Sequence, residues 1–391
     1  MISVLEIGSQ GLDLKDDARR ELQKRRRIKI SNFFKSYNLI LYLESVKENK
    51  ISVEKEADNL TVYFLSGSKI FVFLNLLKIS RRIFKRQSID VISCMDVLLM
   101  GLVGVFLKFF YRIPLNVQLH FDYFSDYFWE FQKRPRIIKI FYKFISWFVY
   151  KNSDSIRVVS KKTKNDLEQG GFKNKLIETI PTPVELNSVN YENVDSKVCE
   201  EFRSGSKTKL LLYVGRLVEG QKELSALLKA FQIVSLACED VRLLLIGCGL
   251  DEEFYKNLAR ELDINRKVFF LGAKSNEEVF SYYACCDIFV ISSKFEGRPT
   301  VLTEATLSKK PIVATRFTGT QDLIIDGKTG YVVDIGDYKS FADRVLKLLN
   351  DPMKIKEFGE AAFANTSKII EKINDISVFA RFLEKTADAK P

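Results

Sequence analysis

The 391-residue chain has few of the side chains that bind metal ions. It contains one histidine and six cysteines, and no two cysteines stand in a Cys-x-x-Cys pair. Structural zinc sites need clusters of these ligands, so we expect none here. We expect the cysteines to be reduced thiols, as is usual for proteins of the cytoplasm.

Long apolar segments are also missing. The longest uncharged apolar run, Val97 to Leu107, has 11 residues, whereas a membrane-spanning helix needs about 20. The apolar stretch before Gly8 is too short for a secretory signal peptide. We therefore predict a cytoplasmic protein, for which contact with the inner face of a membrane would be peripheral.

Charge is abundant and unevenly distributed. The net charge is +11, with 28% charged and 46% hydrophobic residues, which is typical of a globular protein. The basic clusters all lie in the amino-terminal half: Arg19-Arg20, Lys24 to Arg27, Arg81-Arg82 with Lys85-Arg86, and Lys133-Arg134 with Arg136. No nucleic-acid recognition motif accompanies them, so we predict no nucleic-acid partner.

Aromatic residues and lysines are interleaved from Ile137 to Tyr150, where the pattern predicts a helix. Lys139, Lys143 and Lys151 recur near helical spacing, and apolar residues fill the rest of each turn. Such a helix can lie on an anionic membrane with its lysines at the head groups. It can equally pack on its own sheet with the lysine stems reaching outward. Both interpretations stay open.

Strand and helix patterns alternate along both halves of the chain, which predicts an α/β fold. In the first half we expect strands at Ile2–Gly8, Leu39–Glu44, Leu60–Leu65, Ile89–Met95, Leu115–Phe121 and Ser155–Ser160. In the second half we expect them at Lys209–Val214, Val241–Gly247, Val268–Gly272, Ile288–Ser292, Ile312–Thr315 and Tyr331–Val333. The polar, irregular stretch from Glu185 to Lys207 predicts a linker between two domains.

The most informative pattern runs from Glu296 to Glu304. An apolar run, Asp287 to Ser293, precedes it and predicts a buried parallel strand. Gly297 indicates a loop, and Pro299 suits the start of a helix. Glu296 is therefore expected at the carboxyl end of a strand, and Glu304 about one turn into the next helix.

A helix start offers unpaired backbone N–H groups and the positive end of a dipole, which together bind phosphate. Two carboxylates beside such an anion site suit a sugar nucleotide, because carboxylates accept hydrogen bonds from hydroxyl groups. The alternative is that Glu296 and Glu304 are ordinary solvated side chains.

Further segments occur in a fixed order around these glutamates. They are Val214-Gly215-Arg216-Leu217 with Lys222, Leu243 to Gly249, Pro311 to Thr315, Gly319, Asp322 to Ile324, and Asp326 to Gly330. The set resembles the retaining glycosyltransferases of the GT-B architecture, specifically glycosyltransferase family four (glycosyl transferases group 1). The match is dense from about residue 208 to about 335. It thins in the amino-terminal half, where Val159 to Pro181 and the strand of His120 are similar.

The resemblance implies two Rossmann-like, doubly wound domains that face a cleft. The acceptor-side domain would span residues 1–186, followed by a linker at 187–207 and a nucleotide-sugar-binding domain at 208–368. A carboxyl-terminal helix, at about 369–391, would pack back on the first domain. Ligands of such sheets bind outside the carboxyl ends of the strands.

The resemblance also implies roles for the donor site. Arg216 and Lys222 would neutralise the departing diphosphate, where negative charge builds in the transition state. Glu296 would contact the transferred sugar, and Glu304 the ribose. The residues between the glutamates would complete the donor site: Gly297, Arg298, Pro299 and Thr300. One departure is that the family usually has a glycine directly after this lysine, where the present chain has Glu223.

Two residues of the first half enter the predicted site. The resemblance implies that His120 orients a sugar hydroxyl or presents its carbonyl group to the anomeric centre, without moving a proton. The alternative for a lone histidine is a structural role. Gly8 begins a loop, Gly8-Ser9-Gln10-Gly11, that resembles the family's cleft loop but lacks its paired glycines; a plain turn is the alternative.

No metal ion and no cofactor are predicted. Many glycosyltransferases of the other main architecture hold a divalent ion with an Asp-x-Asp motif, and no Asp-x-Asp occurs in this chain. Arg216, Lys222 and a helix amino terminus can carry the charge of the diphosphate instead.

The resemblance and the residues together predict a metal-independent, retaining glycosyltransferase of the hexosyltransferase type. It would move a sugar from a nucleoside diphosphate sugar to a hydroxyl of a glycan or lipid-linked glycan in bacterial surface polysaccharide assembly. Two alternatives remain. One is a nucleotide-sugar epimerase or hydrolase on the same fold, since paired carboxylates also serve hydrolysis. The other is a non-catalytic partner in glycan assembly.

Overall fold

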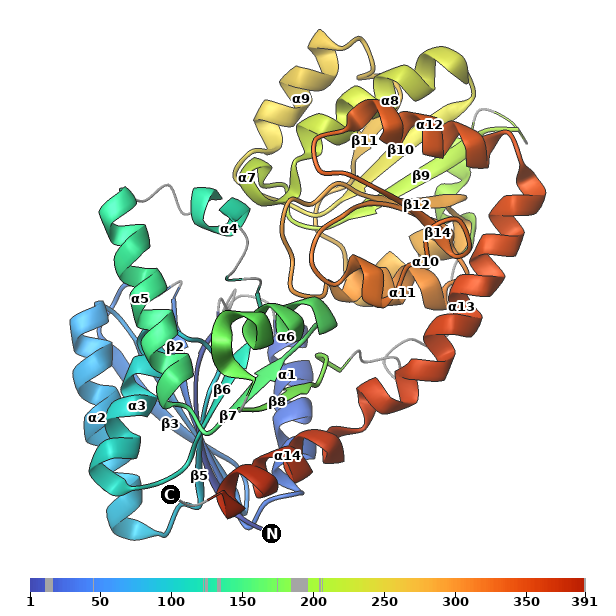
Figure 1. Ribbon diagram of the computed structural model, residues 1–391. Coiled ribbons are helices and arrows are strands. Elements are labelled where there is room, and N and C mark those ends of the chain that lie inside the picture. The colour runs from blue at the N-terminus through green and yellow to red at the C-terminus, as the bar shows by residue number, and fades with distance from the viewer. Residues whose placement is uncertain are drawn as a thin grey trace. The chain divides into compact units, whose positions relative to one another are not determined.

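Two parallel sheets organise the chain, one in each of two structural units (Figure 1). The computed structural model describes residues 1–10, 17–44, 46–121, 123, 126–131, 135–173, 175–183, 196–203, 205 and 207–389. The first unit comprises Met1–His120, Arg134–Pro181 and Asp375–Pro391. The second comprises Phe121–Lys133 and Thr182–Asn374.

The sheet of the first unit has the strand order β3-β4-β2-β1-β5-β6-β7-β8. All neighbouring strands are parallel except β3 and β4, which are antiparallel. Every residue of β5, β6 and β7 is buried, as parallel strands covered by helices on both faces require. The strands are β1 (Ser3–Gln10), β2 (Ser36–Leu43), β3 (Lys50–Ala57), β4 (Leu60–Ser66), β5 (Val91–Cys94), β6 (Leu115–Leu119), β7 (Ser155–Val158) and β8 (Leu176–Thr179).

Helices cover both faces of this sheet. On one face, α2 (Lys69–Arg86), α3 (Leu99–Tyr111) and α5 (Arg136–Asn152) lie side by side (Figure 1). On the other face lie α1 (Asp17–Ser31) and the terminal helix α14 (Ile376–Asp388), which contacts β5 and β6. A shorter helix, α6 (Lys161–Leu167), continues into a π-helical turn (Glu168–Phe172) beside β7 and β8.

The terminal helix is held by apolar packing and by one buried polar contact. Its Phe379, Phe382 and Leu383 join the core of the first unit. The hydroxyls of Thr386 on α14 and Ser155 on β7 are 2.7 Å apart. Helix α14 at the end of the sequence therefore shares a core with strands from the beginning of the sequence.

The sheet of the second unit has the order β11-β10-β9-β12-β13-β14, and all of its strands are parallel. In order of sequence this is 3-2-1-4-5-6, the strand order of a dinucleotide-binding Rossmann sheet. The strand order reverses between β9 and β12. The strands are β9 (Lys209–Val214), β10 (Val241–Ile246), β11 (Val268–Phe270), β12 (Ile288–Ile291), β13 (Ile312–Thr315) and β14 (Gly330–Val333). The predicted α/β fold with two doubly wound, parallel sheets is thus confirmed.

Seven helices of the second unit follow or flank these strands in the described part of the chain. They are α7 (Glu219–Lys222), α8 (Leu224–Ala237), α9 (Glu252–Glu261), α10 (Asn276–Cys285), α11 (Thr300–Leu307), α12 (Tyr338–Leu349) and α13 (Pro352–Asn374). Their apolar faces and the sheet form one core cluster. Among the described residues, no helix of either unit is long and apolar enough to span a bilayer.

A short helix from the first half of the sequence belongs to the second unit. Helix α4 (Asp126–Phe131) places Phe128 and Phe131 against Phe295, with ring centroids 5.7 and 5.5 Å apart. The predicted first domain, 1–186, included this segment. The structural units differ from the predicted limits here because the aromatic side chains of α4 are buried against the loop that follows β12.

Two strands were not expected from the sequence. Strand β3 is a largely exposed edge strand with charged residues, so it lacks the apolar run that marked the other strands. Strand β8 is only four residues long. In addition, the loop predicted at Gly8 is wrong: β1 continues to Gln10 and pairs with β2 along its whole length. Gly11 lies outside the described residues.

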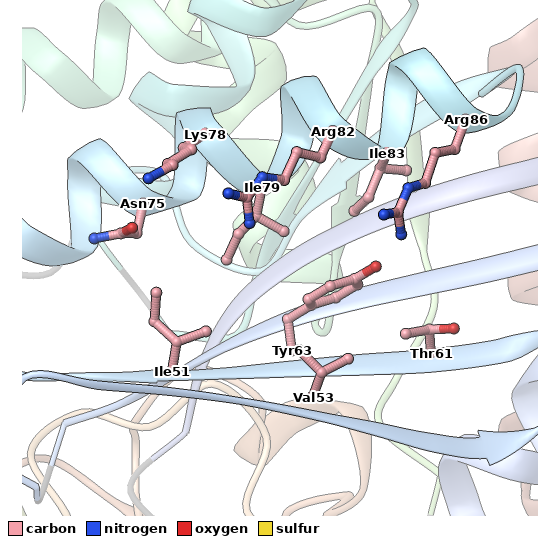
Figure 2. Close-up of a pocket in the computed structure, with 10 residues that line it drawn as sticks. All are labelled: Ile51, Val53, Thr61, Tyr63, Asn75, Lys78, Ile79, Arg82, Ile83 and Arg86. Atoms are coloured by element: carbon pink, nitrogen blue, oxygen red, sulfur yellow. The ribbon is translucent and has the colours of Figure 1, made fainter.

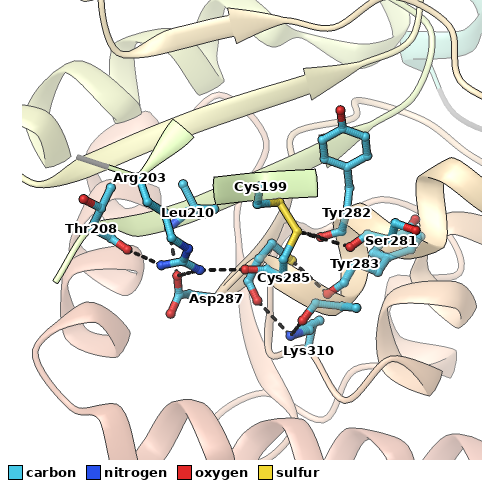
Figure 3. The surroundings of a disulfide bond; sticks show 12 residues. Cys199, Arg203, Thr208, Leu210, Ser281, Tyr282, Tyr283, Cys285, Asp287 and Lys310 are labelled. Carbon is cyan, nitrogen blue, oxygen red and sulfur yellow. Dashed lines mark hydrogen bonds and ion pairs between the residues drawn. A yellow bond between two sulfur atoms is a disulfide. The ribbon is translucent and has the colours of Figure 1, made fainter. Parts of the chain in front are cut away.

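The predicted linker contains regular structure. Residues Ser196–Phe202 form a 3₁₀ helix, whereas 187–195 lie outside the described residues. Cys199 of this helix forms a disulfide with Cys285 at the end of α10, with Cα atoms 6.1 Å apart (Figure 3). The guanidinium of Arg203 donates to the carbonyls of Thr208 and Cys285 beside it. The expectation of reduced thiols is therefore wrong for this pair, which lies 86 residues apart in the sequence; Cys94, Cys238, Cys248 and Cys286 are free.

Candidate active site

The carboxyl ends of β9 and β12 bring together the main charged residues predicted for the donor site. Ligands of open parallel sheets bind at this edge, where the strand order reverses. Lys222 ends the short helix α7 after β9, and Glu296 follows β12. Both side chains are nearly buried, at 7% and 8% exposed.

Lys222 and Glu296 form a close ion pair. The ammonium of Lys222 lies 2.5 Å from Oε1 of Glu296. The Nε2 of Gln221 and the hydroxyl of Ser293 donate to the same oxygen, each at 3.3 Å. Within the described part of the chain, no hydrogen bond reaches the second oxygen, Oε2. The carboxylate is thus held firmly by one oxygen while the other can accept a hydrogen bond from a hydroxyl group.

Backbone contacts fix the two loops that carry this pair. The hydroxyl of Ser292 donates to the carbonyl of Lys222 at 2.8 Å. The backbone N–H of Lys294 donates to the carbonyl of Gln221, also at 2.8 Å. These two hydrogen bonds join the loop after β12 to helix α7. They hold the backbones of Lys222 and Glu296 in place, so the geometry of the ion pair does not depend on the two side chains alone.

Gln221 links the ion pair to Arg216. Its Oε1 accepts a hydrogen bond of 2.6 Å from Nη2 of Arg216, while its Nε2 donates to Glu296. Gln221 was not predicted from the sequence. The signal that could have indicated it is its position directly before Lys222, within a segment that contains two predicted site residues. Arg216 is exposed, and its carbonyl accepts a bond of 3.0 Å from the Tyr213 hydroxyl.

Glycines allow the strand-end loops to approach one another closely. Gly247 has φ +133°, and a Cβ there would lie 1.9 Å from the carbonyl oxygen of Gly215. A Cβ at Gly249 would lie 2.1 Å from the carbonyl oxygen of Leu217. The glycine turn after β10 therefore packs directly on the backbone that carries Arg216, and larger residues would separate the two loops.

Helix α11 begins directly after the Glu296 loop. Pro299 is its N-cap, and no side chain caps its first turn, so amide groups at this end are open to an anion. Glu304 lies on the second turn and accepts a hydrogen bond of 3.2 Å from the Tyr283 hydroxyl. Burial raises the pKa of Glu304, although hydrogen bonds from Thr300 and Tyr283 lower it.

Arg298 adds a further cation at this helix start. Its Nε is buried and has no hydrogen-bond partner in the described structure. Burial lowers the pKa of its guanidinium, although Asp322 acts in the opposite direction. A buried donor without a partner is costly unless a ligand satisfies it. Arg298 therefore fits the predicted donor site.

Glu223 stands where the family usually has a glycine. It has φ +47° and ψ +45°, the left-handed conformation that glycine adopts without strain. Its carboxylate pairs with Lys294 at 3.1 Å. The backbone at this position therefore has the conformation for which a glycine is suited, although the residue is a glutamate.

His120 and Gly8 belong to the first unit. Burial, together with the charges of Arg157 and Arg26, lowers the pKa of His120 to about 3. The imidazole is therefore neutral at physiological pH, which agrees with a role other than proton transfer. Gly8 lies on β1 beside β5, where a Cβ would lie 2.3 Å from Sδ of Met95.

The described residues contain no group of three or more His, Cys, Asp or Glu side chains arranged to hold a metal ion. The charges at the β9–β12 edge are the guanidinium groups of Arg216 and Arg298, the paired ammonium of Lys222 and the carboxylate of Glu296. This arrangement can bind a diphosphate and accept hydrogen bonds from sugar hydroxyls.

Two family models match the chain. The model described as Glycosyl transferases group 1 matches residues 197–364, and the model described as Glycosyltransferase Family 4 matches residues 50–188. An uncharacterized glycosyltransferase of Methanocaldococcus jannaschii is 30% identical over 329 residues, which cover 82% of each chain.

A second relative acts in lipid-linked glycan assembly according to its name. It is the N-acetylgalactosamine-N,N'-diacetylbacillosaminyl-diphospho-undecaprenol 4-alpha-N-acetylgalactosaminyltransferase of Campylobacter jejuni. It is 29% identical over 240 residues, which cover 61% of each chain.

Solved structures share the fold. Sucrose-phosphate synthase of Thermosynechococcus elongatus superimposes with a TM-score of 0.78 at 18% identity, covering 99% of this chain and 100% of that one. HepE of Anabaena, in complex with UDP and glucose, gives a TM-score of 0.72 at 18% identity, covering 98% and 100%. These likenesses confirm the predicted GT-B fold.

Proposed function

Since the chain belongs to glycosyltransferase family four, we propose that it is a metal-independent, retaining hexosyltransferase that uses a nucleoside diphosphate sugar as donor. The observation that carries the proposal is the Glu296 carboxylate, which is held by Lys222 through one oxygen and open at the other. It lies where the strand order reverses, beside the uncapped start of α11.

Each residue of the site has a distinct part in the proposed reaction. The free oxygen of Glu296 accepts a hydrogen bond from a hydroxyl of the transferred sugar. The ammonium of Lys222 has two N–H groups beyond the one that faces Glu296, and these reach phosphate oxygens. Arg216 and Arg298 bind the same diphosphate and stabilise the charge that develops as it leaves.

The remaining donor contacts come from α11 and its loop. The open amides at Thr300 and Gly297 bind phosphate, while Glu304 accepts a hydrogen bond from a ribose hydroxyl. Retention follows if the acceptor attacks the face from which the diphosphate departs, with a phosphate oxygen accepting its proton. Neutral His120 presents its carbonyl group or ring to the sugar rather than serving as a base.

The acceptor is proposed to be a hydroxyl of a glycan, free or linked to a lipid, in surface polysaccharide assembly. The Campylobacter jejuni relative is named for an undecaprenyl-linked acceptor, and HepE was solved with UDP, which supports both halves of the reaction. No base, sugar or linkage is assigned.

Peripheral contact with the cytoplasmic face of a membrane is part of the proposal. Helix α5 buries Ser146, Val149 and Tyr150 near its end, so its second half packs on the sheet. Its outer side stays exposed and apolar, including Phe141 at 58%, and the adjacent α3 exposes Phe110 at 79%. The other exposed apolar or aromatic residues of the two helices are Phe106, Phe109, Tyr111, Ile137, Ile140, Phe144 and Trp147. Surfaces of this kind mark interaction sites, and the neighbouring lysines favour an anionic membrane.

The test of the donor site is a thermal-shift titration with UDP, GDP, ADP and their common sugars, in the presence of EDTA. A ligand that binds the folded state raises the melting temperature with concentration. We expect a shift for one base and its sugars in the wild type, and none in Lys222→Ala. Lys294→Ala is the matched control, because it removes a neighbouring lysine that pairs with Glu223 instead.

A turnover assay then distinguishes transfer from hydrolysis or epimerisation of the donor. A transferase releases nucleoside diphosphate at a useful rate only when an acceptor is added, and the anomeric configuration of the product, observed by NMR, equals that of the donor. No shift with any nucleotide, or release that is independent of acceptor, would contradict the proposal.

A further inference from the structure

A groove lies at the edge of the first unit, between α2 and the β3–β4 hairpin (Figure 2). Its volume is about 360 Å³. Residues of α2 form one side, and residues of the two strands form the floor. The lining residues are Ile51, Val53, Thr61, Tyr63, Asn75, Lys78, Ile79, Arg82, Ile83 and Arg86.

The helical side of the groove is positively charged. Lys78, Arg82 and Arg86 recur every four residues along α2 and border the groove from successive turns (Figure 2). Within the described part of the chain, none of the three has an ion-pair or hydrogen-bond partner. Among the described residues, therefore, no carboxylate pairs with these three charges.

Among the described residues, no acidic side chain lines the groove, and the alternation of β3 explains why. Ile51 and Val53 face the groove, so Glu54 and Glu56 point to the opposite face of the strand. On that face Glu56 pairs with Arg27 of α1. Glu54 and Glu56 of β3 thus face the other side of the sheet, and Asp58 in the turn of the hairpin pairs with Lys55. None of these carboxylates lines the groove, so the three basic side chains give it a positive field.

Part of the floor of the groove is apolar although it is open to solvent, and Thr61 and Tyr63 add hydroxyl groups beside it. Ile51 is 41% exposed and Val53 is 56% exposed, both on an edge strand, where exposed apolar side chains are usually avoided. The buried side chains of Ile79 and Ile83 line the groove from the helix. A ligand that matches the groove has a compact anion at one end and hydrocarbon at the other.

We propose that the groove binds the headgroup phosphate of an anionic phospholipid in a bilayer. The three basic side chains contact the phosphate, and the glycerol and first methylene groups cover Ile51 and Val53. A free phosphate ion would leave the apolar floor unused. Helix α2 also exposes Ile70 and Leu74 and packs beside α3, so the groove borders the exposed apolar side of the helical layer.

This inference rests on the proposed function only for the membrane contact, and not for sugar transfer. The measurement is sedimentation of the full chain with phosphatidylcholine vesicles that contain or lack phosphatidylglycerol. The groove variant is Lys78→Gln/Arg82→Gln/Arg86→Gln. Its control, Lys69→Gln/Arg81→Gln/Lys85→Gln, removes the same charge from the same helix at positions that do not line the groove.

We expect wild type to prefer vesicles with phosphatidylglycerol, and the groove variant to lose on the order of a hundredfold in affinity, about fivefold per basic residue. The control should lose at least ten times less, because its residues do not converge on one phosphate. A second pair uses the strand alternation: Val53→Glu places a carboxylate in the floor and should weaken binding, whereas Ser52→Glu on the opposite face should not.

Equal losses in the groove variant and its control would overturn the proposal in favour of a diffuse basic surface. Glycerol 3-phosphate binding as tightly as vesicles would overturn it in favour of a soluble anion. Wild type without a preference for phosphatidylglycerol would overturn it outright. Nucleotide-dependent thermal shifts are measured on the same variants, so failure of the groove and failure of the donor site give different results.

Discussion

The two sheets follow the same doubly wound plan but place their charged residues differently. In the second unit, Lys222, Glu296 and Arg216 lie in loops and short helices beyond the strand ends. In the first unit, Glu6 and Arg157 lie within strands β1 and β7 and are buried in the sheet. Charges beyond the strand ends can meet a ligand, whereas charges within the strands can meet only the protein.

The buried charges of the first unit belong to a polar network that spans five neighbouring strands, from β2 to β7. Glu6 accepts hydrogen bonds from Tyr37 and Gln118. Arg157 donates to Oε1 of Gln118 at 2.6 Å and to the carbonyl of Ile180 at 2.9 Å, and it lies 4.8 Å from the ring centre of Phe379 on α14. The network therefore joins the terminal helix to the sheet. Its members are satisfied by each other, as buried polar groups must be.

The sharpest test of the comparison is to remove Lys222. Lys222→Met leaves the nearly buried carboxylate of Glu296 without its cation, which costs about 3–5 kcal/mol of unfolding free energy. Transfer should fall by two to three orders of magnitude, roughly the cost of losing one charge-stabilising donor. Calorimetry and a transfer assay measure the two effects.

The double variant Lys222→Met/Glu296→Gln is the control. It should recover most of the stability, because no unpaired charge remains, but none of the transfer rate. If the single variant were as stable as wild type, the ion pair would be more hydrated than its burial indicates. That result would contradict the comparison between the two units.

Glu6 in the first unit is expected to have an effect of intermediate size, on the pH dependence of the melting temperature. Burial raises its pKa from the ordinary 4.5 to about 7, although Gln118 and Arg157 lower it. The folded state therefore favours the protonated carboxyl, and this stabilising contribution is complete below pH 4.5 and lost as the pH rises through 7. As the pH rises from 4.5 to 7, the melting temperature of wild type should therefore fall relative to that of Glu6→Gln.

Glu54→Gln, on an exposed position of β3, is the matched control and should keep the pH dependence of wild type. If Glu6→Gln and wild type show parallel profiles, the carboxylate of Glu6 is ionised at all these pH values. Arg157 would then be the ion-pair partner of an ionised Glu6 rather than a cation beside a protonated carboxyl group.

The smallest effect is predicted for His120. Because its pKa is lowered to about 3, its ring should not titrate between pH 5 and pH 9. It is the only histidine, so its imidazole proton resonances can be assigned without a variant. Constant chemical shifts across this range are expected, and a midpoint near the ordinary pKa would show that the ring is solvated and can exchange protons.

The sequence predicted the second unit better than the first, for local reasons. Arg216 and Glu296 follow an apolar strand within a few residues, and Lys222 and Glu304 lie on the next helices, α7 and α11, so the strand ends and the site residues could be predicted together. Gln221 was missed because its contacts run to Arg216 and to Glu296, and the latter is 75 residues away. In the first unit, β3 was missed because an exposed edge strand needs no apolar run.

The sequence by itself determined the alternation of strands and helices and the charged residues at the strand ends. Hydrophobic runs, glycine and proline act over a few residues. The strands, helices and strand-end charges can therefore be predicted one segment at a time. Only the tertiary structure decided that Lys222 pairs with one oxygen of Glu296, that α4 packs on the second unit, and that Cys199 meets Cys285. Each of these contacts joins residues far apart in the chain, and packing in three dimensions, rather than any local pattern, selects the partner.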